Sequence, residues 1–467
     1  MPIIDIIVFI AYLILVLGIG FYYYKKNKNT NDYYVGGRNM NSFHVGLSVV
    51  ATDVGGGFSI GLGGLGFIMG LSGSWMLFTG FIGAWLSAVF LIPKVIDKAK
   101  NLNFLTFPQL LKNSYGTKVA LVAGIISFIG YLGFTSSQLL AGAKLAVGTF
   151  PELGLENALY IMGAVAVIYT VFGGIKAVIY TDTFQWSILM FGLIFIGIPI
   201  AYNALGGYET IVNTLPDKLF SLTNLSWVKF INWFITIVPI WFVGMTLYQR
   251  IYACKDEKTA KKAWYIAGFF EYPIMAFMGI ILGLFARVGA EQGLFIAEGF
   301  SAAAEMDAEI GLPMLLKTVL PVGLMGLMLS AYFSAIMSTA DSCLLAASGN
   351  FITDILGLKE DNPKAIKISQ IVTFVIGFVA ILIASYMTSV LDLMLLSYSF
   401  MVSGLLIPVL AMLFAKNKKP VAALSAMLIG GFTTLILSFL TIDIPFGFDP
   451  ILIGVIASLL VYLLIKK

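Results

Sequence analysis

Apolar stretches of about 20 residues recur along the whole chain and are separated by short polar connections. A helix of that length crosses a hydrocarbon core about 30 Å thick, whereas a barrel strand is about half as long. Of the 467 residues, 59% are hydrophobic and only 11% are charged, which excludes a water-soluble globular domain. The sequence therefore predicts an all-α polytopic membrane protein.

The distribution of basic residues predicts how the chain is oriented. We expect about thirteen spans, from 4–24 to 449–465. Alternate connections then hold most of the 28 Lys and Arg residues, Arg250 among them. Because basic connections stay in the cytoplasm, the N-terminus is expected outside and the C-terminus inside.

Several function classes are excluded by what the chain lacks. One histidine, with no CxxC and no HExxH motif, leaves little to bind zinc or haem. The glycines of 61–66 lie inside a span rather than after a strand, which argues against nucleotide binding. No aromatic-interleaved basic surface suggests nucleic acid. We expect one membrane domain over 1–467 that is not an enzyme.

Two predicted spans are interrupted. Span 41–70 contains Ala51-Thr52-Asp53-Val54-Gly55-Gly56-Gly57, and three successive glycines lower helix stability by roughly 1 kcal/mol each. The seventh span is interrupted at 239–244, where a proline removes a helical donor and a glycine follows. Such breaks line a cavity or hold a cation, or the glycines allow close helix packing.

The two breaks begin two comparable groups of five spans, 41–205 and 226–415. The groups start on opposite sides of the membrane, as in inverted-repeat transporters. An extra first helix, 4–24, and C-terminal helices at 420–465 would flank this five-plus-five core.

The ninth predicted span, 311–345, carries polar groups on one face. Ala335, Ser338, Thr339 and Ser342 follow helical spacing, and Asp341 lies ~60° from Ser338 on the helical wheel. Oxygen ligands of this kind suit a hard cation such as sodium. The alternative is that the hydroxyls bond to carbonyls one turn earlier or join helices together.

Asp182 opens the sixth predicted span, after a basic connection. From its position alone, the carboxylate is a helix-start residue that the helix dipole favours.

Five segments together resemble the sodium/solute symporters, the family of bacterial proline and sialic acid carriers and animal sugar and choline carriers. The resemblance covers nearly the whole chain. The segments are Val35-Gly36-Gly37-Arg38, 51–57, Gly173-Gly174 through Asp182 and Gln185, Gln249-Arg250 through Lys258, and 334–342.

The resemblance implies a LeuT-like inverted-repeat core with sodium between the second and ninth spans. It implies sodium ligands at the carbonyls of Ala51, Val54 and Ala335 and at the hydroxyls of Ser338 and Thr339. Some members hold a second sodium ion at positions matching Asp182 and Ser342. Here Asp341 stands beside that hydroxyl, so one or two coupled ions remain possible.

The solute site is expected around Asp53, where choline carriers have a tryptophan and proline carriers have an aspartate. Asp53 would attract an amino group or organise the broken helix. Further candidates for the cavity wall are Gly55, Gly56, Gly57, Phe58, Trp75, Thr135, Gln138, Trp241 and Tyr248.

The expected function is sodium-coupled symport of a small organic solute, such as proline, by alternating access. The alternatives are sodium-coupled transport of choline or another quaternary amine, and proton-coupled transport. For proton coupling the spans offer only isolated candidates, namely Lys144, Glu271, Lys317 and Asp392. We expect a multi-pass protein of the cell membrane, as in the bacterial inner membrane, that is a monomer or a weak homo-oligomer.

Overall fold

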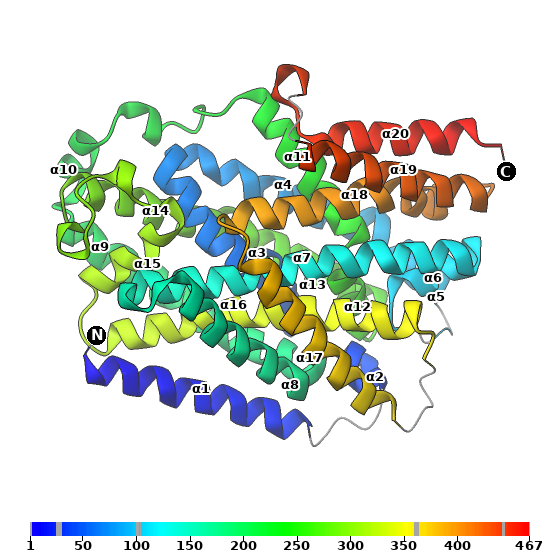
Figure 1. The fold of residues 1–467 in the computed structure, drawn as a ribbon, viewed down its shortest axis with the longest axis horizontal. Coiled ribbons are helices and arrows are strands. Elements are labelled where there is room, and N and C mark those ends of the chain that lie inside the picture. The colour runs from blue at the N-terminus through cyan, green and yellow to red at the C-terminus, as the bar shows by residue number, and fades with distance from the viewer. Residues whose placement is uncertain are drawn as a thin grey trace.

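The computed structural model describes residues 2–24, 30–99, 102, 104–358, 364–440 and 444–466. Every regular element in these ranges is a helix. Long helices lie side by side, and the two termini lie at opposite ends of the long axis (Figure 1). The all-α prediction is confirmed.

The helices follow one another with short connections. They are α1 (Ile3–Tyr24), α2 (Thr30–Val35), α3 (Ser42–Met69), α4 (Trp75–Leu86), α5 (Ile92–Ala99), α6 (Phe107–Tyr115), α7 (Thr117–Thr149), α8 (Gly154–Gly192), α9 (Ile198–Ala204), α10 (Gly207–Thr214), α11 (Trp227–Val243), α12 (Met245–Ala253), α13 (Glu257–Phe269), α14 (Ala276–Glu291), α15 (Ala308–Val319), α16 (Leu324–Gly349), α17 (Ala365–Ala384), α18 (Val390–Phe414), α19 (Pro420–Phe439) and α20 (Pro450–Leu464). A π-helical segment, η7 (Phe270–Met275), connects α13 to α14.

Within the described ranges, nine helical segments are long and apolar enough to cross a membrane, or ten if the bent pair α11 and α12 is one span. Two shorter apolar helices, Ile3–Leu15 and Pro450–Leu464, accompany them. The chain is therefore a multi-pass membrane protein, and the count of thirteen stays a prediction.

Both predicted helix breaks are confirmed. In α3, Gly55 has φ 39° and ψ −165°, which only a glycine adopts readily. The second break falls at Gly244, between α11 and α12, which are bent by 41°. Glycine therefore interrupts each helix at the position that the sequence indicated.

The predicted ninth span, 311–345, was wrong as one helix. α15 ends at Val319 and α16 begins at Leu324. Pro321 favours the extended backbone of Leu320, and Gly323 has φ 90°. The polar segment 334–342 lies wholly within α16.

Helix α16 forms the centre of the bundle. All its residues except Leu324 and Leu327 are buried, and it packs against α3, α7, α8 and α1. α1 and the pair α19–α20 lie at opposite edges of the bundle (Figure 1). The polar face of α16 therefore meets the break in α3 away from lipid.

Candidate ion and solute site

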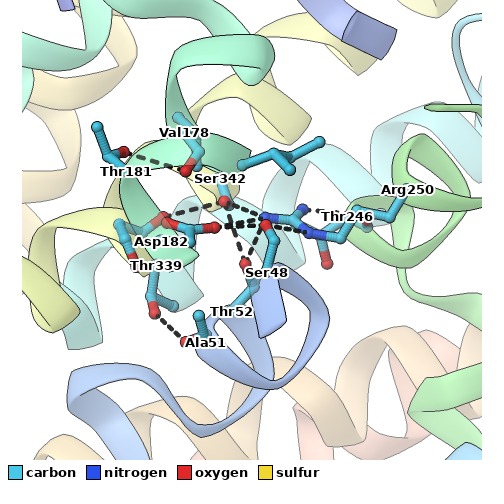
Figure 2. A network of polar contacts seen from close by, with 12 residues as sticks. Ser48, Ala51, Thr52, Val178, Thr181, Asp182, Thr246, Arg250, Thr339 and Ser342 are labelled. Atoms are coloured by element: carbon cyan, nitrogen blue, oxygen red, sulfur yellow. Dashed lines mark hydrogen bonds and ion pairs between the residues drawn. The ribbon is translucent and has the colours of Figure 1, made fainter. Parts of the chain in front are cut away.

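Oxygen atoms of α3 and α16 converge beside the break in α3. Thr339 Oγ1 donates a hydrogen bond to the carbonyl of Ala51 at 2.9 Å and lies 3.4 Å from the carbonyl of Ala335. Ser338 Oγ donates to that second carbonyl at 3.2 Å. Figure 2 shows the contact between Thr339 and Ala51. Four of the predicted ligand residues thus meet at one point, with buried Val54 one turn from Ala51.

The glycines after Asp53 allow both the helix break and the close approach of α16. A Cβ on Gly55 would lie 2.3 Å from Thr339 Oγ1, and one on Gly56 would lie 2.4 Å from Ile336 Cγ1. Real Cβ atoms do not approach other atoms this closely. These contacts bear out the interpretation of the glycines as packing residues, whereas a cavity beside the break stays a prediction.

The hydroxyls of α16 also bond within their own helix. Ser342 Oγ donates to the carbonyl of Ser338 at 2.9 Å, as Ser338 and Thr339 do to that of Ala335. Such bonds are usual for Ser and Thr in helices. Two of the three also bond to α3, because Thr339 donates to the carbonyl of Ala51 and Ser342 accepts a hydrogen bond from Thr52 at 3.2 Å. These bonds link the α16 face to the broken helix.

A second polar cluster surrounds Asp182 (Figure 2). Ser48 Oγ donates a hydrogen bond to Asp182 Oδ2, and Arg250 Nη2 lies 3.5 Å from the same oxygen. The guanidinium of Arg250 also donates to Ser48 Oγ at 3.0 Å, Thr52 Oγ1 at 2.5 Å and Ser342 Oγ at 2.8 Å. We call these five residues the arginine network; Arg250 and Asp182 in it are fully buried.

Arg250 was assigned to a cytoplasmic connection from the sequence, and that assignment was wrong. It lies on α12, the second half of the broken span, where every residue is buried. A signal was present in the sequence, because Arg250 follows the Gly244 break by less than two helical turns. Asp182 likewise pairs with a charge instead of only starting a helix, since it lies well inside α8.

Asp341 faces away from the arginine network. Its carboxyl accepts a hydrogen bond from Thr170 of α8, and no hydrogen bond joins it to any of the five network residues. Its other oxygen, Oδ2, has no hydrogen-bond partner in the described part of the chain. Asp341 and Ser342 thus point to different neighbours despite being adjacent.

Asp53 lies next to the break and meets a residue that the sequence did not connect to it. The carboxyl groups of Asp53 and Glu271 interact with one another, and both residues are buried. Close by, Gln138 Oε1 accepts a hydrogen bond from the backbone N–H of Gly57 at 3.0 Å. Spans far apart in the sequence thus meet α3 here, Glu271 at Asp53 and Gln138 at Gly57.

Other expected wall residues have more ordinary roles. Trp241 is buried against Gly83, Thr135 bonds to the carbonyl of Tyr131, and Tyr248 bonds to that of Phe242. Trp75 lines a cavity of about 390 Å³ with six residues between Leu222 and Phe230. The side chain of Phe58 lies outside the part that the structure describes.

Three charged residues expected to be isolated have carboxyl or ammonium neighbours. Glu271 faces Asp53, and Lys317 Nζ pairs with Glu298 at 2.6 Å. Buried Lys144 pairs with Asp307 and Glu309, each at 2.6 Å. Lys144, Asp307 and Glu309 line a cavity of about 500 Å³ together with residues of α3, α11 and α14.

The comparisons with known proteins agree with this geometry. The model of the sodium:solute symporter family matches residues 33–430. The sodium/proline symporter of Escherichia coli is 27% identical over 81% of this chain and 76% of its own length. The sodium/pantothenate symporter of Escherichia coli is 27% identical over 97% of this chain and 94% of its own.

Solved structures show the same fold. A sodium-coupled sialic acid symporter in a substrate-bound outward-open state matches with a TM-score of 0.81 and 22% identity, over 98% of this chain and 96% of its own. A nucleobase-cation-symport-1 family transporter in a closed conformation matches with a TM-score of 0.60 and 15% identity, over 92% of both chains.

Proposed function

Because this chain belongs to the sodium:solute symporter family, it performs sodium-coupled symport of a small solute, and we propose that the solute is an amino acid of the proline type. One observation carries the proposal for the site: Thr339 of α16 bonds to the Ala51 carbonyl beside the break in α3. In inverted-repeat transporters, the coupling ion binds where the unwound backbone of a broken helix meets a second helix.

We place the coupling sodium ion at this junction. Its ligands are the carbonyls of Ala51, Val54 and Ala335 and the hydroxyls of Ser338 and Thr339. An ion bound there stabilises the contact of α3 with α16 and raises the affinity for the solute, and by linkage the solute raises the affinity for sodium equally. Rocking of the helix bundle then opens the path to the cytoplasm.

We propose that the ion leaves through the arginine network, where the oxygens of Asp182 and Ser342 serve as its ligands. The guanidinium of Arg250 already bonds to Ser342 and lies beside Asp182. A second sodium ion would bind to these oxygens only when the guanidinium moves away. Asp341 would extend the path towards Thr170.

A solute with an ammonium group suits the buried Asp53 better than an anionic solute does, because a buried carboxylate repels an anion. This favours a proline-like solute over pantothenate. A quaternary amine such as choline remains the second candidate, since it also carries a positive charge.

For the architecture we propose about thirteen spans with the N-terminus outside and the C-terminus inside. Segments 41–205 and 226–415 would be the inverted repeats, flanked by 4–24 and 420–465, in a single domain over 1–467. The broken elements at the start of each repeat and the termini at opposite ends of the long axis support this arrangement (Figure 1). We propose a monomer or weak homo-oligomer.

Uptake into proteoliposomes tests the proposed solute. L-proline, pantothenate and choline would each be supplied under an inward sodium gradient, and again with potassium in place of sodium. We expect L-proline to accumulate against its concentration gradient under the sodium gradient, and not when potassium replaces sodium. Uptake that survives replacement of sodium by potassium would rule out the coupling mechanism, and sodium-driven uptake of pantothenate without L-proline would rule out the solute assignment.

A further inference from the structure

Glu271 occupies an unusual place for a carboxylic acid. It lies in the π-helical segment η7 and is fully buried. A Cβ on Gly80 of α4 would lie 1.7 Å from Glu271 Oε1. The carboxyl group therefore fills space that only a glycine on α4 leaves open.

The carboxyl pair of Asp53 and Glu271 has no cationic partner in the described part of the chain. Both oxygens of Glu271 and Oδ2 of Asp53 lack a hydrogen-bond donor there. No Lys, Arg or His of the described residues forms an ion pair with either group. The titratable neighbours are Tyr398 of α18 and Cys343 of α16, neither of which is a cation. Buried carboxylates usually pair with a cation or bind a metal ion.

An aromatic ring packs against the same helix as Glu271. The indole of Trp241 packs against Gly83, and a Cβ there would lie 2.3 Å from Trp241 Cδ1. Gly80 and Gly83 share one face of α4 because they are three residues apart. Glu271 and Trp241 therefore lie side by side against this face. This face of α4 thus meets one acidic and one aromatic side chain.

We propose that Asp53 and Glu271 together bind a positive charge supplied from outside the chain, either a sodium ion or the ammonium group of the solute. The pair joins the broken helix α3 to the connection between α13 and α14. A cation bound between them would hold these two elements together during the transport cycle. This inference rests on the proposed function, because it concerns the ligands of the same carrier.

The test uses Glu271→Gln, which keeps the shape and removes the acid, with Glu156→Gln as the control. Glu156 is exposed and bonds to Tyr160. Two probes separate the sources of charge: L-proline, and tetrahydrofuran-2-carboxylate, in which an ether oxygen replaces the ammonium group. The measurements are half-saturation for uptake, inhibition by the analogue, and the ratio of sodium to L-proline transported into proteoliposomes.

If the ammonium group is the ligand, Glu271→Gln weakens L-proline uptake on the order of 30-fold, whereas inhibition by the analogue and the sodium ratio do not change. If sodium is the ligand, the variant loses one coupled ion per solute and the melting temperature responds less to sodium without solute. Glu156→Gln should match the wild type in all measurements.

An unchanged solute affinity, sodium ratio and sodium-dependent melting in Glu271→Gln would overturn the inference, because the acid would then serve packing alone. If Glu271→Gln folds poorly, Asp53→Asn takes its place in the test. It should then show the same loss of L-proline affinity or of one coupled sodium ion. A wild-type protein that takes up no L-proline would refute the proposed solute instead. Thermal shift would then still decide whether sodium is the ligand of the pair. Uptake measurements with choline in place of L-proline would decide whether an ammonium group is the ligand.

Discussion

The substitution Gly55→Ala tests whether the break in α3 and its contact with Thr339 hold the coupling ion. The new Cβ would lie 2.3 Å from Thr339 Oγ1 and 2.7 Å from Cγ2, and the backbone at φ 39° disfavours any side chain. Strain of about 1–3 kcal/mol and overpacking of about 1–3 kcal/mol together give about 2–6 kcal/mol. The substitution should therefore push α16 away from the Ala51 carbonyl.

The assay is the melting temperature of the detergent-solubilised protein over a sodium titration, since a ligand of the folded state raises it. Gly55→Ala should melt lower without sodium and lose most of the sodium-dependent rise. The matched control is Gly142→Ala, because a Cβ there meets no atom closer than 3.7 Å. It should be neutral or more stable by up to about 1 kcal/mol, with a normal sodium response.

A double substitution separates packing from ion binding. Thr339→Ala removes Oγ1 and Cγ2, the two atoms closest to the new Cβ. In the Gly55→Ala background it should restore part of the melting temperature but none of the sodium response. A wild-type sodium response in Gly55→Ala, or in the double variant, would refute the assignment of this junction as the ion site.

Three further predictions concern charged groups. Lys144→Met leaves the buried partner Glu309 unpaired and should lower stability by about 3–5 kcal/mol, with Glu309→Gln restoring part of it in unfolding experiments. Arg250→Gln should cost a similar amount, and its combination with Asp182→Asn should cost less than the sum in a double-mutant cycle; full additivity would show that the pair is uncoupled. Asp256 caps α13, and its hydrogen bonds with Thr259 lower the pKa of its carboxyl group in the folded state. The ionised carboxylate therefore stabilises the folded protein at pH values above the pKa that Asp256 has in the unfolded chain. This stabilisation is lost as the pH falls through the lower pKa of the folded state. Asp256→Asn should flatten that acid-side slope of the melting temperature.

The sequence was most informative where backbone chemistry decides the structure. Gly55 and Gly244 marked both helix breaks because glycine destabilises a helix wherever it occurs. The face of Ala335, Ser338 and Thr339 followed from helical periodicity alone. What α16 meets across the bundle did not follow, since spacing says nothing about the neighbour.

Partners distant in the sequence explain what could not be predicted. Arg250 was counted with the loop residues because charge is usually exposed, yet three hydroxyls and one carboxylate from α3, α8 and α16 surround it. Glu271 was considered isolated because Asp53 lies more than 200 residues earlier in the chain. The span 311–345 was expected to be one helix because the run is largely apolar, although Pro321 and Gly323 interrupt it and separate α15 from α16.

The position of Arg250 just beyond the bend at Gly244 has an electrical consequence. Any change of that bend carries a fixed positive charge through part of the membrane field, at about 2.3 kcal/mol per full charge crossing 100 mV. Voltage steps should therefore evoke brief capacitive currents even when no substrate is carried. Such currents would report the movement of α12 in real time.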